Sequence, residues 1–416
     1  MGRNLVDVLT TKSYVTLVSG EPGVGKTYLA LLACSKKESC TYITYSEPEK
    51  SLTDKLAQID PNYKGSFGVV SMITGDPSHV YSIIMNGLMK GEIVVVDSIN
   101  SMLYGVNEPS SLRTFIQLLY TAAKNKDGTL ILLAEGPAIM GSLDFRYVSD
   151  AVVNLSYDEV LGSKVRKAEV IKDRSFPIEK STYYFTISNG IRFLKEFSPE
   201  SLLKPSLLQK ISRPKIAEFE LEKLFGYNIL YEADESIPPT YLRYFWVFVA
   251  SDFVLRGYKV GYWPGPSEDK DALMSDFKNL LGSLYENVSI YEVPYEALGF
   301  DWKKVYGYIE SSAIRGPKIN IINLASNEEL ALKDPNGYEF LLENLVKMNI
   351  RLNRLAITYG YPSFKALRIS AKYATAKRSL SGKGNYIFWK SLKPVSELYA
   401  VELDAEKGEL NFVEVK

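Results

Sequence analysis

A glycine-rich segment near the start of the chain has the residue types and spacing of a phosphate-binding loop. Residues 20–27 read Gly-Glu-Pro-Gly-Val-Gly-Lys-Thr and fit the pattern G-x-x-x-x-G-K-[ST]. Glycines let the backbone curl so that its N–H groups point at phosphate oxygens, and the positive end of the following helix faces the same phosphates. Lys26 would contact the β- and γ-phosphates, and the Thr27 hydroxyl would ligate magnesium. The segment therefore predicts a site for ATP with Mg²⁺. The predicted nucleotide-binding residues are Gly20, Glu21, Pro22, Gly23, Val24, Gly25, Lys26, Thr27 and Tyr28.

A second candidate metal ligand ends an apolar run. The residues Ile93-Val-Val-Val-Asp97 predict a buried strand that delivers one carboxylate at its carboxyl end, where ligands bind in parallel sheets. Asp97 follows Lys26 by about 70 residues and is followed by Ser98. We therefore predict that Thr27 and Asp97 both hold the magnesium ion. Asp97 would do so through a water molecule.

The elements that must position these residues alternate between strands and helices. We expect strands at 14–18, 41–45, 66–72, 92–96 and 130–134, and helices at 27–36, 51–58, 79–88 and 112–123. Apolar runs without a polar face are typical of parallel strands that are covered by helices on both faces, so the pattern predicts an α/β fold. An antiparallel extension of the sheet is predicted by further strands at 151–155, 167–171 and 183–187, with a tight turn at Asn189-Gly190.

A polar segment with prolines, from about Phe197 to Lys215, separates two halves of the chain. At about 100–200 residues per domain, a chain of 416 residues predicts two domains, which we place at 1–200 and 215–416. The second half alternates again. Its expected strands are 228–232, 259–262, 319–323, 355–358, 386–389 and 396–403, and its expected helices are 241–256 and 338–347.

Composition and charge are those of an ordinary globular protein, with 46% apolar and 24% charged residues. The 49 basic residues equal the 49 acidic ones, which argues weakly against chain-wide, non-specific binding of nucleic acid. The longest apolar run, Phe245–Ala250, is far shorter than the ~20 residues that cross a bilayer, and the start of the chain has no signal-peptide pattern. We expect a soluble cytoplasmic protein without a membrane partner.

The cysteines and the histidine exclude some classes of site. The two cysteines, Cys34 and Cys40, make no disulfide framework and indicate a reducing compartment, and we expect Cys34 to be a small core residue. With His79 as the only histidine, a zinc site of the usual kind is excluded. We place His79 at the surface and give it no catalytic role.

Together the motifs resemble the KaiC/RadA branch of the RecA-like ATPases over about residues 1–195. Four segments carry the resemblance in order: 20–27, Tyr42-Ile-Thr-Tyr-Ser-Glu47-Pro, Val94-Val-Val-Asp97-Ser98 and Val170-Ile-Lys172-Asp-Arg174. In this family the acid after the second strand polarises the attacking water, which implies a general-base role for Glu47. The family often has two adjacent acids there. Because Ser46 replaces the first, we expect slow hydrolysis.

The resemblance also implies an assembly. In the family the Lys-x-Arg pair reaches the γ-phosphate bound by the neighbouring subunit of a ring, commonly a hexamer, so Lys172 and Arg174 are predicted to act in trans in a homo-oligomer. The two side chains alternate on one strand and should point the same way. Glu135, which ends the fourth apolar strand, resembles the family's sensor-like polar residue. The chain departs from the family at its start, where only about fourteen residues precede the first strand.

The second half can be laid on the first without a gap, residues 230–242 on 17–29, with Thr-Tyr-Leu in common. The second half lacks the features that would hold a nucleotide. Prolines stand where the first half has the last glycine and the lysine of the loop, and proline offers neither an N–H nor a charge. No acid follows the strand that ends at 262–264. We infer a degenerate RecA-like lobe that does not bind ATP. The replacements are Pro238 for Gly25, Pro239 for Lys26 and Asn323 for Asp97.

Three functions stay open. The first is a KaiC-like regulatory ATPase whose nucleotide state controls assembly or the binding of a protein partner. The second is a RadA-like recombinase paralogue that acts on DNA, which would need long basic loops. The segment between Glu135 and Asp150 is short and has Arg146 as its one base, which favours the first function. The third is an ATP-sensing scaffold that does not hydrolyse. A small-molecule kinase fits the motifs less well.

Overall fold

The chain divides into two compact units, Met1–Leu194 with Lys416, and Lys195–Val415. The computed structural model describes residues 4–72, 77–102, 109–125, 127–136, 139–140, 143–188, 190–198, 210–212, 225–314, 316–404 and 409–416. Most residues between 200 and 215, where we predicted the domain boundary, lie outside these ranges, as does Asn189 of the predicted turn. Among the helices described, none combines the length and the hydropathy of a membrane span.

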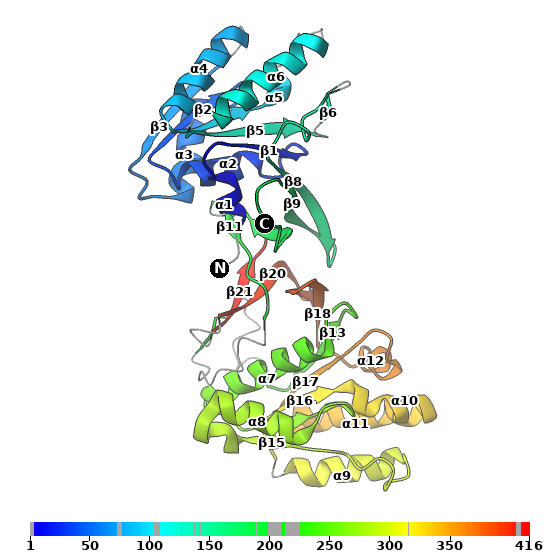
Figure 1. Cartoon of the computed structure of the whole chain (residues 1–416). Helices are drawn as coiled ribbons and strands as arrows, with labels where there is room; N and C mark the ends of the chain where they lie inside the picture. Colours follow the sequence, from blue (N-terminus) through cyan, green and yellow to red (C-terminus); the bar gives the residue numbers. More distant parts are fainter. Residues whose placement is uncertain are drawn as a thin grey trace. The chain divides into compact units, whose positions relative to one another are not determined.

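Unit 1 is built on a nine-stranded sheet in the order β11-β10-β9-β8-β1-β5-β4-β2-β3 (Figure 1). Its strands are β1 (Tyr14–Gly20), β2 (Ser39–Thr44), β3 (Ser66–Ser71), β4 (Ile93–Asp97), β5 (Thr129–Glu135), β8 (Ala151–Val160), β9 (Ser163–Asp173), β10 (Thr182–Thr186) and β11 (Arg192–Phe193). The strands from β8 to β3 in this order pair in parallel, and β8, β9, β10 and β11 pair antiparallel. The predicted α/β fold with an antiparallel extension is confirmed. A separate short pair joins β6 (Ile139–Met140) to β7 (Leu143–Asp144).

Helices cover both faces of the parallel strands. Alternate residues of β5 show why: Ile131 and Leu133 belong to one buried cluster, with residues of α2 and α3, whereas Leu130 and Leu132 belong to the other, with residues of α4 and α6. The helices are α1 (Leu5–Leu9), α2 (Lys26–Cys34), α3 (Glu49–Ile59), α4 (Pro77–Met89), α5 (Ile99–Met102) and α6 (Pro109–Lys124). The short α1, which is capped by Asn4, was not predicted.

The end of α2 and the start of β2 are joined covalently. Cys34 and Cys40 are both buried and form a disulfide, with their Cα atoms 5.4 Å apart. Cys34 lies in the core, as predicted, and the sequence analysis did not predict its bond to Cys40, which the short connection between them brings within reach. His79 is exposed, as predicted, and lies on α4.

Unit 2 contains a ten-stranded sheet in the order β12-β21-β20-β19-β18-β13-β17-β16-β14-β15. Its strands are β12 (Lys210–Ser212), β13 (Asn228–Ala233), β14 (Val260–Trp263), β15 (Val288–Ile290), β16 (Ile319–Asn323), β17 (Leu355–Gly360), β18 (Ala376–Lys383), β19 (Tyr386–Lys393), β20 (Val395–Asp404) and β21 (Glu409–Glu414). From β18 to β15 the pairing is parallel. The order β18-β13-β17-β16-β14-β15 repeats the order β8-β1-β5-β4-β2-β3 of unit 1.

Helices also flank this second sheet (Figure 1). They are α7 (Pro239–Leu255), α8 (Lys270–Leu281), α9 (Trp302–Ile314), α10 (Glu328–Lys333), α11 (Pro335–Arg351) and α12 (Lys365–Ser370). Residues of α7 and α8 pack on one face of the sheet, and residues of α9 to α12 belong to the cluster on the other face. Two sheets of mostly parallel strands flanked by helices are therefore present, as the sequence predicted.

Candidate nucleotide site

The predicted phosphate-binding loop connects the end of β1 to the start of α2, at the carboxyl edge of the parallel strands. Gly25 has a φ of +114°, and a Cβ on it would lie 3.1 Å from the ring of Phe185. A side chain is therefore disfavoured at Gly25 by both conformation and space. Lys26 and Thr27 follow as the first residues of α2, so they stand at the positive end of a helix.

The Lys26 side chain lies across this loop. It is 7% exposed, and its Nζ donates hydrogen bonds to the carbonyl oxygens of Gly20 at 2.8 Å and Glu21 at 3.0 Å. Burial lowers the pKa of Lys26, while the carboxylates of Glu135 and Asp97 act in the opposite direction. The ammonium group is thus held at the loop by neutral acceptors and by the field of two carboxylates.

The two predicted magnesium ligands lie next to each other. The Thr27 hydroxyl donates to Oδ2 of Asp97 at 3.2 Å, and the buried Tyr42 hydroxyl donates to the same oxygen at 2.6 Å. Burial raises the pKa of Asp97, and the hydrogen bonds from Tyr42 and Thr27 lower it. A hydroxyl and a carboxylate are hard oxygen ligands of the kind that Mg²⁺ prefers. The sequence analysis gave no role to Tyr42, which orients the carboxylate.

Glu47, the candidate general base, follows β2 and is paired with the helix behind it. Its Oε1 accepts a hydrogen bond from the Ser51 hydroxyl and forms an ion pair with Lys55, both of which belong to α3. Its backbone N–H donates to the Thr44 hydroxyl at 3.0 Å, which fixes the start of the turn. The ion pair with Lys55 thus engages one of the two carboxylate oxygens.

Glu135 lies where the resemblance placed a sensor residue. It ends β5 beside β1, and Gly20 forms a bridge with Gly136, the next residue. The Glu135 N–H donates to the side-chain oxygen of Asn100 at 2.8 Å, which fixes the strand end. The charge of Glu135 acts on Lys26, so the carboxylate belongs to the surroundings of the loop.

The antiparallel extension also contributes side chains to the loop. The Tyr157 hydroxyl of β8 donates to the Gly23 carbonyl oxygen at 3.0 Å. The Arg166 guanidinium of β9 lies 5.5 Å from the Tyr157 ring centre, and its buried Nε has no hydrogen-bond partner among the described residues. Sequence reasoning missed Tyr157 and Arg166 because only the register of β8 and β9 pairs them beside the loop.

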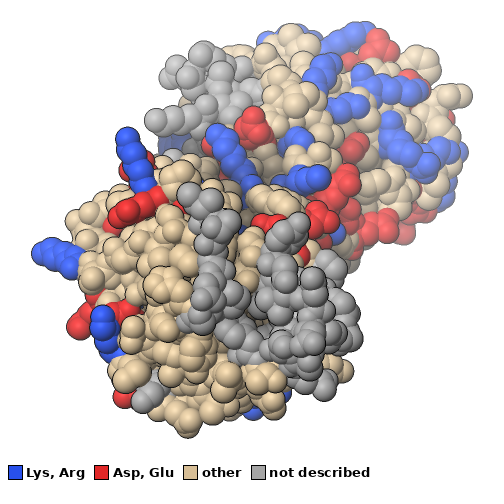
Figure 2. All heavy atoms as spheres, turned by 90° about the horizontal axis from the view of Figure 1, so that it is seen from above, with Lys and Arg blue, Asp and Glu red and all other residues tan. Residues whose placement is uncertain are grey.

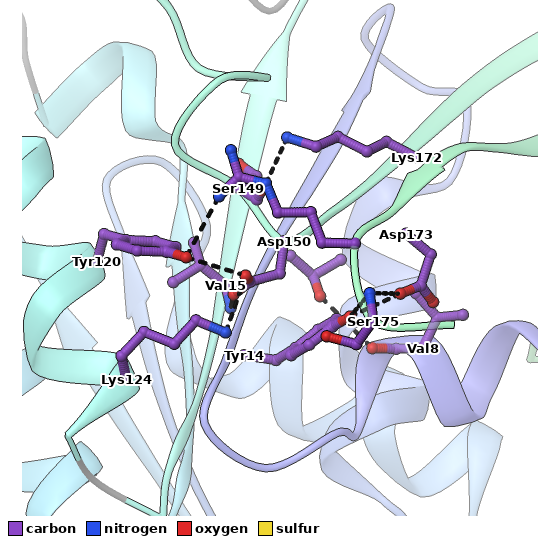
Figure 3. Close-up of polar contacts among 12 residues, drawn as sticks. Val8, Tyr14, Val15, Tyr120, Lys124, Ser149, Asp150, Lys172, Asp173 and Ser175 are labelled. Atoms are coloured by element: carbon purple, nitrogen blue, oxygen red, sulfur yellow. Dashed lines mark hydrogen bonds and ion pairs between the residues drawn. The ribbon is translucent and has the colours of Figure 1, made fainter. Parts of the chain in front are cut away.

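Lys172 and Arg174 lie toward the opposite ends of the strands from the loop, and Figure 3 shows Lys172 beside Ser149. Asp173 pairs with Ala151 and Ala151 with Thr16, near the start of β1, whereas the loop follows the end of that strand. Within one chain the structure therefore does not bring Lys172 and Arg174 together with Lys26.

Both cations contact one segment, residues 146–149, although Arg174 lies one residue beyond the end of β9 and not on the strand with Lys172. Lys172 Nζ donates to the carbonyl oxygens of Arg146 and Ser149, the latter at 2.7 Å. Arg174 donates to the carbonyl oxygen of Tyr147 and, at 3.2 Å, to the Tyr120 hydroxyl. The segment is thereby fixed to the end of β9.

Asp150 anchors the same edge (Figure 3). It accepts hydrogen bonds from the Val15 N–H at 3.0 Å and the Tyr120 hydroxyl at 3.2 Å, and its Oδ1 lies 2.9 Å from the Lys124 ammonium. These contacts join β1, α6 and the start of β8. The edge that carries Lys172 and Arg174 is therefore a fixed part of unit 1.

The equivalent loop of unit 2 has a different chemistry. Pro238 and Pro239 precede and begin α7, and the Ser236 hydroxyl is bonded to the backbone of Gly382, donating to its oxygen at 3.0 Å. Asn323, at the end of β16, donates to Oε2 of Glu268 at 2.7 Å. Sequence comparison missed Glu268, an acid that reaches this edge from a loop five residues beyond β14.

Comparison with known families adds to this geometry. The model of the KaiC ATPase family matches residues 78–197, from α4 to β11, which include Asp97, Glu135 and the Lys-x-Arg pair. The glycine-rich loop precedes the matched region. No curated protein matches the chain. Together with the sheet order, this match supports a KaiC-like domain of the RecA-like P-loop ATPases in unit 1.

Proposed function

We propose that unit 1 binds ATP with Mg²⁺ at the P-loop and hydrolyses it slowly, and that the nucleotide state of this cytoplasmic protein controls its assembly or its binding of a protein partner. The observation that carries the proposal is the convergence of Lys26, Thr27 and Asp97 at the carboxyl edge of β1 and β4. A cation, a hydroxyl and a carboxylate at the start of a helix fit a magnesium-bound triphosphate.

Each residue then has one task. Lys26 exchanges the carbonyl oxygens of Gly20 and Glu21 for phosphate oxygens, and Thr27 and Asp97 hold the metal. Magnesium, when bound, neutralises charge on the phosphates. Tyr42 keeps the Asp97 carboxylate oriented, and Tyr157 keeps the loop against β8.

Binding is tested by isothermal titration calorimetry of the full chain with ATP and MgCl₂. We expect one ATP per chain, and an affinity about 100-fold lower in Lys26→Ala, because charge-assisted hydrogen bonds to phosphate are lost. Lys36→Ala, an exposed lysine just beyond the same helix, is the matched control and should bind like the parent. Absence of heat from the parent, or parental affinity in Lys26→Ala, would refute the proposal.

Slow hydrolysis is proposed because Glu47 stands alone and is paired with Lys55. A non-hydrolysing scaffold is the second candidate, and the same ion pair favours it, since it engages the carboxylate that would accept a proton. Phosphate release separates the two. If the protein is an ATPase, phosphate release should be lost in Glu47→Gln and should rise several-fold in Lys55→Met. Lys50→Met, at an exposed lysine, is the control and should release phosphate like the parent. A scaffold should release no phosphate in any of these variants.

A role in trans for Lys172 and Arg174 remains part of the proposal. They are too far along the sheet to serve their own P-loop, which agrees with action on a neighbour. Light scattering should detect a larger assembly with ATP and Mg²⁺ than without. The double variant Lys172→Ala/Arg174→Ala should bind ATP but fail to assemble or to accelerate hydrolysis.

The DNA-binding alternative has less support. Figure 2 shows basic and acidic side chains interspersed on the face in view, in keeping with the equal numbers of the two signs. Phosphate backbones attract surfaces with clustered lysine and arginine. A DNA-binding assay at several salt concentrations tests it: affinity that falls steeply with salt would favour the recombinase paralogue.

We also propose that unit 2 is a degenerate RecA-like lobe that binds no nucleotide. Its support is the repeated strand order together with the prolines at the start of α7. A stoichiometry of two ATP per chain in the calorimetric experiment would contradict this proposal.

A further inference from the structure

Unit 2 contains a cavity of about 320 Å³ between its sheet and helices α9 and α11. It lies mainly on the face opposite to α7, and one end of it reaches Glu268 at the carboxyl edge of β14 and β16. Small-molecule pockets have volumes of about 300–1,000 Å³, and this cavity falls at the lower end of that range. Its size therefore permits a small organic ligand.

The cavity exists because the sheet presents small or polar side chains to it. The residues that face it from β17 are Ala356 and Thr358, and Asn320 and Ile322 do so from β16. Their strand neighbours, such as Ile321 and Ile357, point to the other face and are buried there. Ile322 is only half-buried although it lies inside the sheet, which shows that the space in front of it is not filled by protein.

An aromatic pair forms one side of the cavity. The rings of Trp263 and Tyr291 stack with centroids 4.8 Å apart and an interplanar angle of 21°. Trp263 Nε1 donates to the side-chain oxygen of Asn320 at 3.1 Å. Gly261 is required for this arrangement, since a Cβ on it would lie 2.6 Å from that oxygen. A fixed aromatic surface of this kind favours a flat ring as ligand.

The helices add an apolar wall, and the end of a loop adds a cation. Ile309 of α9 and Leu345 of α11 are half-buried apolar residues in the lining. Arg354, 5% exposed, also lines the cavity and donates to the Gly316 carbonyl oxygen at 3.3 Å. Tyr291 and Arg354 both line the cavity.

Two carboxylates also line the cavity: Glu268 accepts hydrogen bonds from the Gly265 N–H and from Asn323, and Glu292 is exposed. Among the described residues of this lining Arg354 is the one cation, and arginine stays charged in proteins, so an anionic group is favoured at the Arg354 end.

We propose that this cavity is a binding site for a planar aromatic small molecule with one anionic group, its ring against Trp263 and its anion toward Arg354. The apolar lining excludes water from the ring, and the small residues of β16 and β17 leave the room that the ring needs. The site does not depend on the nucleotide function proposed for unit 1.

The probe is 1-anilinonaphthalene-8-sulfonate, an aromatic anion whose fluorescence rises in apolar surroundings, titrated into the full chain. We expect saturable binding of one dye per chain. Ala356→Leu and Thr358→Leu place a larger residue in the cavity and should each weaken binding at least tenfold. These substitutions introduce the residue that unit 1 carries at the equivalent positions, Leu130 and Leu132. Ala297→Leu, at an exposed alanine outside the lining, is the matched control and should bind like the parent.

Dye binding by both filled variants at parental affinity would overturn the proposal. Thermal melting followed by circular dichroism checks that the filled variants fold. If either melts below the parent, Ile322→Phe fills the cavity from another strand and takes its place. Uncharged N-phenyl-1-naphthylamine tests the anionic group: it should bind at least several-fold more weakly than the sulfonate, and equal binding would overturn that part of the assignment.

Discussion

The loops after β1 and β13 occupy equivalent places in two sheets of the same strand order, yet they differ in what they can hold. Lys26 begins α2, whereas Pro239 begins α7. Each loop is nevertheless tied to its neighbouring strand, through Tyr157 and Gly23 in unit 1 and through Gly382 and Ser236 in unit 2. The comparison shows that such a loop can be attached to the neighbouring strand whether or not it carries the residues that bind phosphate.

The sheets differ in a second respect, on the face away from α2 and α7. Unit 1 fills this layer with large residues such as Leu130 and Leu132, whereas unit 2 has Ala356 and Thr358 at the equivalent positions. The first unit therefore has its candidate site at the edge of the sheet, and the second has its cavity under the helices. One strand order supports ligands in two different places.

The largest expected effect is on the free energy of unfolding, and it compares the packed layer under α4 and α6 in unit 1 with the cavity under α9 and α11 in unit 2. Leu132→Ala should cost about 2–5 kcal/mol of unfolding free energy, because it opens a new cavity in a packed core. Thr358→Ala, at the equivalent position, should cost less than about 1 kcal/mol, since it borders existing space. Urea denaturation measures both. All four tryptophans lie in unit 2, so their fluorescence follows that unit, while circular dichroism follows both. Equal losses would break the comparison.

The next effect concerns the residue at the end of β4 and β16. Asp97→Asn, which introduces the residue of unit 2, should reduce the ATP affinity measured with Mg²⁺ about tenfold or more and leave the affinity in EDTA unchanged, because the carboxylate serves the metal. The reverse change, Asn323→Asp, should produce no ATP binding in unit 2, where the prolines leave no loop for phosphate. A second bound nucleotide in Asn323→Asp would contradict the account of unit 2.

A smaller effect is the pH dependence of ATP affinity. Burial lowers the pKa of Lys26 in the free protein, and the ammonium form binds phosphate. As the pH rises from neutral toward 10.5, the ordinary value, Lys26 loses its proton earlier than an exposed lysine does, so affinity should fall. Fluorescence titration with labelled ATP between pH 7 and pH 10 measures this. Lys26→Arg should show a flatter profile, because the guanidinium keeps its charge. Identical profiles for the parent and Lys26→Arg would mean that the pH dependence does not arise from Lys26.

The smallest effect tests the attachment of the two loops. Tyr157→Phe removes one hydrogen bond to Gly23 and should weaken ATP binding by a factor of about 2–5, with a loss of about 0.5–1 kcal/mol. Ser236→Ala removes the corresponding bonds in unit 2 and should cost a similar stability without any change in ATP affinity. Calorimetry and urea denaturation measure the two quantities. A change of ATP affinity in Ser236→Ala would mean that the second loop also contacts nucleotide.

The sequence predicted the parts of this structure that depend on local pattern. Apolar runs such as Ile93–Asp97 identified the buried parallel strands, and the glycine-rich segment placed Lys26 and Thr27 beside Asp97. The sequence analysis did not predict elements with weak periodicity. Among them are β18, whose residues Ala376–Lys383 are mostly polar, and the five-residue α1. Strand β18 is held by pairing with β13 and β19, which no local pattern encodes.

The candidate site shows the same division. The positions of Tyr42, Lys55 and Tyr157 follow from register and from helix packing, so their contacts with Asp97, Glu47 and Gly23 required the fold. The cavity of unit 2 had a sequence signal, the alternation of small or polar residues with isoleucine and leucine in β16 and β17. Such alternation indicates a half-exposed strand when it is read alone, and only the covering helices turn this space into a cavity.

Strand β9 joins two places that serve different subunits in the proposed assembly. Arg166 lies beside the P-loop of its own chain, and Lys172, six residues later and about 20 Å along the strand, lies at the edge that would face a neighbour. Pairing with β8 and β10 on its two sides fixes the register of β9, so Arg166 and Lys172 keep a constant separation. In the proposed assembly β9 would therefore hold the cation beside its own P-loop at a set distance from the cations that face a neighbouring subunit.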